Sequence, residues 1–204
     1  MYEGEKLLIA NRGEIAVRIL RTAKEIGLAT LTIYTPSDAL APHVTLADET
    51  VALPLVSGQS ESRAYCDSKV IISICRSYSV TLLHPGYGFL SENEEFARTV
   101  VENGITWLGP SSDIIKTMGN KHEARHVAEA AGIAIVPGSK GLVKDEEEAV
   151  TVAHQVGFPV ILKATAGGGG LGLVVCNDEP ELFQAFSRTS QHAEVQEFYS
   201  GQIH

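Results

Sequence analysis

Short apolar runs alternate with amphipathic segments at the start of the chain. Residues Lys6–Ala10 (KLLIA) form an apolar run of the kind that buried parallel strands show. A helix is predicted over Glu14–Ile26, because apolar residues at positions 15, 19, 23 and 26 share one face and Gly27 is a suitable C-terminal stop. Thr30–Tyr34 predicts a second strand, so the segment is a βαβ unit.

The same alternation continues to about residue 110. The pattern predicts a helix over Ser68–Tyr78, a strand over Val80–Leu83, a helix over Glu94–Asn103 and a strand over Ile105–Leu108. The loop between the strand over Val80–Leu83 and the helix over Glu94–Asn103 is His84–Asn93, which is rich in Gly and Pro. Alternating strands and helices predict an α/β fold, with a doubly wound parallel sheet in the first half of the chain.

Beyond a linker at Gly109–Ser112 the pattern changes to that of a smaller α+β unit. Helices are predicted from about Asp113 and over Lys121–Ala131. Further elements are strands over Ile133–Val136, Pro159–Ala164 and Gly172–Cys176 and a helix near Glu146–Val156. We therefore expect one domain over residues 1–112 and a second over residues 113–204.

Composition narrows the classes of protein that fit. A chain of 204 residues that is 44% hydrophobic can bury a core, and its net charge of −9 disfavours nucleic-acid binding. No apolar run is long enough to cross a bilayer, and the N-terminus has no signal or transit character. The three cysteines are odd in number and form no CxxC, which indicates free thiols in a reducing compartment. We expect a cytoplasmic protein that binds neither nucleic acid nor membrane.

A run of glycines follows the predicted strand that contains Lys163: Gly167, Gly168, Gly169 and Gly170. Backbone N–H groups without side chains can wrap a phosphate chain, and the ammonium of Lys163 can neutralise it. Taken alone, the glycines fit a flexible hairpin loop equally well. The Gly-Lys-Ser/Thr ending of a P-loop is absent, and no GxGxxG follows the first strand, so P-loop and dinucleotide-binding proteins are disfavoured.

Two further segments are candidates for ligand binding. Lys121 stands at the start of a predicted helix, where a solvent-facing lysine is the ordinary interpretation and a second phosphate-binding lysine is the alternative. The loop HPGYGFLSEN (His84–Asn93) follows a strand, at the edge where open α/β sheets place their sites. Glycines at positions 86 and 88 let the main chain approach a ligand, although a structural turn fits the loop equally well.

Together these segments resemble the biotin carboxylase family. The resemblance is carried by LIANRGEIAVRI (residues 8–19), HPGYGFLSEN (84–93), Gly109-Pro110, MGNK (118–121), VPGS (136–139) and PVILKATAGGGGLG (159–172). It implies a Rossmann-like domain that binds no dinucleotide, followed by the front part of an ATP-grasp domain. The α+β lid, about residues 133–190, would contain the glycine run.

The resemblance also implies a reaction, in which ATP activates bicarbonate as carboxyphosphate and the resulting CO₂ is attacked by a biotin ring nitrogen. Lys121, Lys163 and the four glycines match ATP-binding residues of the family, and Tyr87 and Gly88 match the loop that faces biotin. Mg²⁺ is expected on the phosphates. The implied partners are the biotin carboxyl carrier and carboxyltransferase domains of a longer parent, with a homo-oligomer as a further option.

The last residues fit the family in two ways. In the first alignment, His192–Gln196 (HAEVQ) resembles the family strand HVEVQ. This alignment implies that His192 binds ATP and that a family segment is missing before His192. In the competing alignment Glu197 is the hinge acid that contacts adenine, and His204 begins the next strand. The competing alignment preserves the order of the family segments but matches fewer residues, so we favour the first.

The family's metal-binding glutamates and its catalytic lysine and arginine fall beyond His204. We therefore expect no metal ligand within this chain, and we expect the fragment alone to be inactive. Leu171 and Leu173 stand where many members have Arg or Lys and Met, and they resemble the urea carboxylase branch. A urea carboxylase or urea amidolyase parent is favoured. A pyruvate or acyl-CoA carboxylase parent and a non-catalytic module derived from ATP-grasp are the alternatives.

Overall fold

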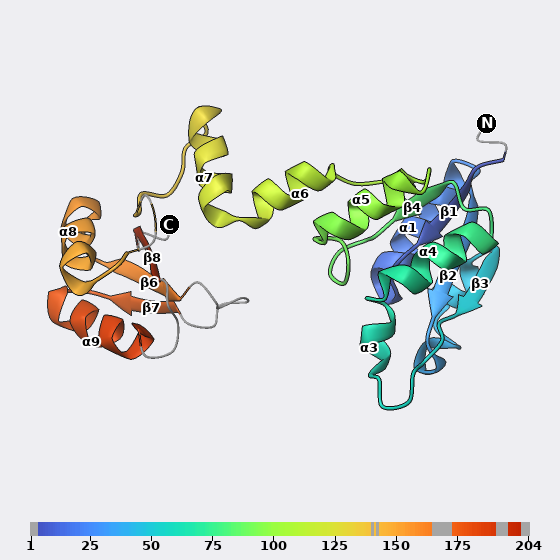
Figure 1. Cartoon of the computed structure of the whole chain (residues 1–204), viewed down its shortest axis with the longest axis horizontal. Helices are drawn as coiled ribbons and strands as arrows, with labels where there is room; N and C mark the ends of the chain where they lie inside the picture. Colours follow the sequence, from blue (N-terminus) through green and yellow to red (C-terminus); the bar gives the residue numbers. More distant parts are fainter. Residues whose placement is uncertain (1–3, 140, 142, 165–172, 191–195, 201–204) are drawn as a thin grey trace. The chain divides into compact units, whose positions relative to one another are not determined.

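A computed structural model describes residues 4–139, 141, 143–164, 173–190 and 196–200, and the chain divides into the compact units Met1–Asn120 and Lys121–His204. Figure 1 shows the elements of both units. The division follows α6 (Ser112–Gly119), because Ile115 on this helix packs against the core of the first unit. The domains expected from the sequence, residues 1–112 and 113–204, differ from these units only in the unit to which α6 belongs.

The first unit contains a five-stranded sheet with the order β3-β2-β1-β4-β5, and every pair is parallel. The strands are β1 (Lys6–Ile9), β2 (Ala29–Tyr34), β3 (Glu49–Ala52), β4 (Leu82–His84) and β5 (Thr106–Trp107). In β1, Leu8 is paired with Leu31 on one neighbour and Leu83 on the other. The predicted parallel sheet is confirmed.

Helices cover both faces of this sheet. Alternate residues of β1 point to opposite sides, so the strand has an apolar face on each side to bury. Leu7 and Ile9 belong to a core shared with α1 (Gly13–Glu25). Leu8 belongs to a second core shared with α4 (Ser68–Ser77) and α5 (Glu94–Glu102). The short helices η1 (Pro36–Asp38), α2 (Pro42–Leu46) and α3 (Glu61–Ala64) complete the unit. The doubly wound arrangement is therefore confirmed.

The buried stripe of α1 differs in part from the predicted one. The residues of this helix that are buried are Ala16, Ile19, Leu20 and Ala23. The predicted stripe ended at Ile26, but this residue is 46% exposed because it is the C-cap, beyond the last helical turn. The helix itself forms where it was predicted.

The second unit is a small α+β structure. Its strands β6 (Val160–Ala164), β7 (Leu173–Cys176) and β8 (Gln196–Ser200) form an antiparallel sheet with the order β7-β6-β8. The helices α8 (Glu146–Val156) and α9 (Glu179–Ser190) contact this sheet (Figure 1). The shared core contains Ala149, Ala153, Leu162, Cys176, Leu182 and Phe186. The remaining helix of the unit is α7 (Lys121–Ala130).

The strand predicted over Ile133–Val136 is wrong. These residues have no strand assignment, and Ile133 is 61% exposed. Side chains such as Ile and Val favour a strand only where a neighbouring strand and a buried face are available. Pro137, which follows, also has no N–H to donate to a ladder. Within the part of the chain that the structure describes, no helix combines the length and the apolar character needed to cross a membrane.

Candidate functional site

Three loops meet at the carboxyl edge of the parallel sheet. They follow β1 at Asn11, β2 at Thr35 and β4 at Pro85. Carboxyl ends of parallel strands lie at one edge, and ligands of open α/β sheets bind there. The loop after β4 contains the residues predicted to face biotin, Tyr87 and Gly88.

The first turn of this loop is held by side chains at its base. The side-chain amide of Asn11 donates two hydrogen bonds of 2.8 Å, from Nδ2 to the carbonyl oxygens of Pro85 and Tyr87. The N–H of Gly86 donates to Nδ1 of His84 over 2.9 Å. Because Nδ1 accepts, the proton of the neutral His84 ring is on Nε2. The loop therefore has a defined backbone path at its start.

The middle of the loop is held by an aromatic contact. Phe89 stacks on Tyr65 with ring centroids 5.1 Å apart. The hydroxyl of Tyr65 donates to Asp38 over 2.7 Å, and the guanidinium of Arg12 makes a bidentate contact with the same carboxylate. Hydrogen bonds from Arg12 hold the pKa of Asp38 below its ordinary value, and burial together with the Asp38 contact raises the pKa of Tyr65 to about 12. Arg12 and Asp38 are therefore a charged pair, and Tyr65 is protonated, at neutral pH.

The predicted biotin-facing residues lie on the open side of the loop. Tyr87 is 63% exposed, and its hydroxyl donates to Glu14 over 3.3 Å. A Cβ added at Gly88 would meet no atom within 4 Å, so the main chain there has open space beside it. The structure thus places both predicted residues at the sheet edge, on the open side of the loop.

The predicted ATP-binding residues belong to the second unit. Lys163 is half-buried in the central strand β6, and Lys121 is the first residue of α7. The glycine run and His192 lie outside the described residues. The pairing of β8 with β6 makes Glu197 the register partner of Lys163.

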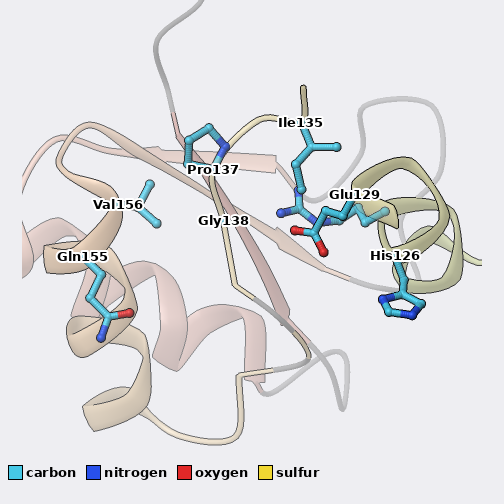
Figure 2. A pocket seen from close by; sticks show the side chains of 8 residues that line it. His126, Glu129, Ile135, Pro137, Gly138, Gln155 and Val156 are labelled. Carbon is cyan, nitrogen blue, oxygen red and sulfur yellow. The ribbon is translucent and has the colours of Figure 1, made fainter. Parts of the chain in front are cut away.

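A cavity of about 560 Å³ also lies in the second unit. Figure 2 shows residues that line it: His126 and Glu129 come from α7, Pro137 from the segment after it, and Gln155 from the last turn of α8. The guanidinium of Arg125, another lining residue, donates to the carbonyl oxygen of Val136 over 2.9 Å. Among the residues that the structure describes, none of those predicted to bind ATP or biotin is in the lining of this cavity, and nothing in the pattern of the sequence indicated it.

The residues that support the loop were not predicted from the sequence. Asn11 and Arg12 were noted within a long motif, whereas Asp38 and Tyr65 lie in a stretch for which no element was predicted. Their contacts join residues far apart in the chain, so local periodicity carries no signal for them. Among the described residues, no group of three His, Cys, Asp or Glu side chains is arranged to hold a metal ion.

The hydrogen bond at His84 predicts a pH-dependent loop. Burial, with a smaller effect of the positive charge of Arg18, lowers the pKa of His84 below its ordinary 6.5. The contribution of the Gly86–His84 bond is therefore complete above pH 6.5 and is lost as the pH falls through the lowered pKa. Ring resonances of ¹³C-labelled histidine, assigned with His84→Gln, should titrate below 6.5 for this residue. A midpoint at or above that value would contradict the prediction.

Comparison with known proteins finds two family models and several relatives that match this chain. Residues 3–115 match the family "Biotin carboxylase, N-terminal domain", and residues 120–203 match "Carbamoyl-phosphate synthase L chain, ATP binding domain". A protein of Emericella nidulans named "Putative urea carboxylase" is 51% identical over 93% of this chain, which spans 15% of that protein. Biotin carboxylase 1 of Bacillus subtilis is 45% identical over 93% of this chain, which spans 41% of that protein.

A solved structure shows the same similarity in three dimensions. It is the biotin carboxylase domain dimer of the Hydrogenobacter thermophilus 2-oxoglutarate carboxylase, in complex with MgADP, ADP and bicarbonate. The TM-score is 0.83 at 39% sequence identity, with 96% of this chain and 44% of that chain covered. The chain therefore spans less than half the length of each of these three relatives.

Proposed function

The chain belongs to the biotin carboxylase family, and from this premise we propose that it forms the front part of a biotin carboxylase module that carboxylates biotin with ATP and bicarbonate. The observation that carries the proposal is the constellation at the sheet edge. The HPGYGFLSEN loop there is held at its start and at Phe89, and it is open beside Tyr87 and Gly88. The α/β fold, with a Rossmann-like unit before an ATP-grasp unit, agrees with this role.

In the proposed reaction the protein contributes mainly by binding the phosphates and aligning the reactants, and covalent catalysis by the protein contributes little. Lys163 on β6 and Lys121 at the start of α7 would bind the phosphates of ATP, with the glycines 167–170 closing over them. Mg²⁺ would accompany the nucleotide. Tyr87 and Gly88 would face the biotin ring.

The test uses the complete parent protein with ATP, bicarbonate and free biotin. We expect ADP formation that depends on bicarbonate, and ¹⁴C from labelled bicarbonate incorporated into biotin. Wild-type protein that hydrolyses ATP without carboxylating biotin would favour another ATP-grasp ligase. Protein that neither binds ATP nor carboxylates biotin would favour the non-catalytic module.

For the carboxyl acceptor, we propose urea. Leu171 after the glycine run supports the urea branch, as does the 51% identity to the Emericella protein. The sequence identity to the Bacillus biotin carboxylase is only a little lower, at 45%, because carboxylases with different acceptors share the module that carboxylates biotin. Urea, pyruvate and acyl-CoA should be compared as acceptors in the complete parent, and activity with pyruvate or acyl-CoA alone would overturn the assignment of urea.

The carrier and carboxyltransferase domains remain proposed partners, since each relative named above is longer than this chain. Self-association is proposed as well, because the Hydrogenobacter domain is described as a dimer. The free cysteines Cys66, Cys75 and Cys176 agree with a reducing compartment, and we place the reaction in the cytoplasm.

The two alignments of the tail predict different effects of two alanine variants. If Glu197 is the hinge acid, Glu197→Ala in the complete parent should raise the KM for ATP, whereas His192→Ala should leave it near the wild-type value. Loss of one hydrogen bond to adenine corresponds to a change of about 3- to 10-fold. The reverse result, measured by steady-state ATP hydrolysis, would support the alignment that makes His192 an ATP contact.

A further inference from the structure

We propose that Asn11 is a positioning residue that holds the biotin-facing loop in its working conformation. The inference rests on the proposed function, because that function assigns biotin to Tyr87 and Gly88. Asn11 is 3% exposed, so its side chain is too deeply buried to touch biotin itself. Its effect on the reaction would pass through the main chain of Pro85, Gly86 and Tyr87.

The amide of Asn11 uses all of its polar groups. Both hydrogens on Nδ2 are directed at loop carbonyls, those of Pro85 and Tyr87, each at 2.8 Å. Oδ1 accepts from the N–H of Arg12 at 2.9 Å. A rotated amide would place its oxygen against two carbonyl oxygens, so only the observed orientation satisfies the loop. One side chain after β1 thereby fixes two carbonyls in the loop after the neighbouring strand β4.

Gly86 shows how closely the loop approaches this amide. A Cβ added at Gly86 would lie 2.7 Å from Nδ2 and 3.1 Å from Cβ of Asn11. Gly86 also has φ +68°, a conformation that side chains with a Cβ disfavour. Gly88 has φ +69° but open space beside it. The loop thus packs against Asn11 on its inner side and leaves its outer side free for a ligand.

The role proposed for Asn11 affects the carboxylation of biotin but not the hydrolysis of ATP in the absence of biotin. Without the Nδ2 donors, two carbonyls in the loop lose their partners, and the loop can take other paths in which Tyr87 and Gly88 no longer face the biotin ring. The phosphates of ATP are assigned to Lys163 and Lys121, which belong to the other unit. A change at Asn11 should therefore weaken the use of biotin while leaving biotin-independent ATP hydrolysis intact.

The experiment compares wild type, Asn11→Ala and Asn11→Asp in the complete parent, with free biotin as the substrate. Asp has the size of Asn but presents oxygen in place of the Nδ2 donor. Loss of two neutral hydrogen bonds predicts that kcat/KM for biotin falls on the order of 10- to 100-fold, chiefly through KM. Bicarbonate-dependent ATP hydrolysis without biotin should stay close to the wild-type rate. Equal losses in both reactions, or no loss in either, would overturn the positioning role.

A second set of variants tests the contact from the loop side and remains informative if Asn11→Asp folds poorly. Gly86→Ala should raise the KM for biotin, and its effect should be smaller in the Asn11→Ala background, where the clash with Nδ2 is absent. Gly104→Ala is the matched control, because Gly104 has φ +74° but no atom within 4 Å of an added Cβ. Additive effects of the two changes, or an equal effect of the control, would contradict the contact.

The outcomes also separate this inference from the proposed function. A wild-type parent that carboxylates no biotin would overturn the proposed function and, with it, the assignment of biotin to this loop. An active wild type with unchanged Asn11 variants would overturn the role of Asn11 alone.

Discussion

Replacing Lys163 with alanine is expected to lower kcat/KM for ATP by about 10²- to 10³-fold in the complete parent, measured as bicarbonate-dependent ATP hydrolysis. Lys163 lies on β6, the central strand of the second sheet, where the neighbouring strands β7 and β8 restrict the path of its backbone. An ammonium held on such a strand can neutralise a phosphate without reorganising during the reaction. The effect should appear in the chemical step as well as in binding, because charge develops during phosphoryl transfer.

Lys144→Ala is the matched control for this prediction. Lys144 belongs to the same unit and has the same charge, but it is exposed and lies before α8 rather than in the sheet. Its removal changes the net charge equally, so a general electrostatic effect would appear in both variants. Unchanged ATP kinetics in Lys163→Ala, or equal losses in the two variants, would count against the assigned role.

Replacing Asp38 with alanine is expected to destabilise the first unit by about 2–4 kcal/mol. Asp38 is 5% exposed and accepts hydrogen bonds from Arg12 and from the hydroxyl of Tyr65. Its loss leaves the buried hydroxyl without this acceptor. The side chain of Arg12 is 45% exposed and can be hydrated, which keeps the cost below that of a fully buried pair. Urea unfolding followed by fluorescence of Trp107, the single tryptophan of the chain and part of the first core, measures the change.

The control for Asp38 is Asp48→Ala. Asp48 accepts from the backbone and hydroxyl of Thr30, but its side chain is 50% exposed, so water replaces much of what is lost. We expect a clearly smaller change in the free energy of unfolding. An effect as large as that of Asp38→Ala would show that loss of negative charge, rather than the Arg12–Asp38–Tyr65 contacts, is responsible.

The same contacts give a pH dependence of defined sign. Arg12 holds the pKa of Asp38 below its ordinary 3.8, so the folded state binds the proton less readily than the unfolded state. The extra stability is complete above that ordinary value and is lost as the pH falls through the lowered pKa. The difference in unfolding free energy between wild type and Asp38→Ala should therefore narrow in strong acid, and a constant difference would contradict this origin.

The alternation of apolar runs and helical faces determined much of this protein by itself. It specified the parallel sheet, the helices on both its faces and the strands of the smaller α+β unit at β6 and β7, because only a few arrangements bury such local periodic patterns. The long motifs identified the family, and the match over residues 3–115 confirmed it. The loop at residues 84–93 was also singled out from its glycines and its place after a strand.

Only the tertiary structure decided which segments pair as strands and which distant residues contact one another. Ile133–Val136 has the composition of a strand, yet within the described ranges these residues have no strand assignment and pair with no strand. The pairing of β8 with β6 set Glu197 opposite Lys163, a register that the sequence pattern did not predict. Asn11 contacts the loop across more than 70 positions of the chain, at separations of 74 and 76 residues. Such contacts depend on the order of strands in the sheet, which brings β1 beside β4, and no periodicity within either segment encodes them.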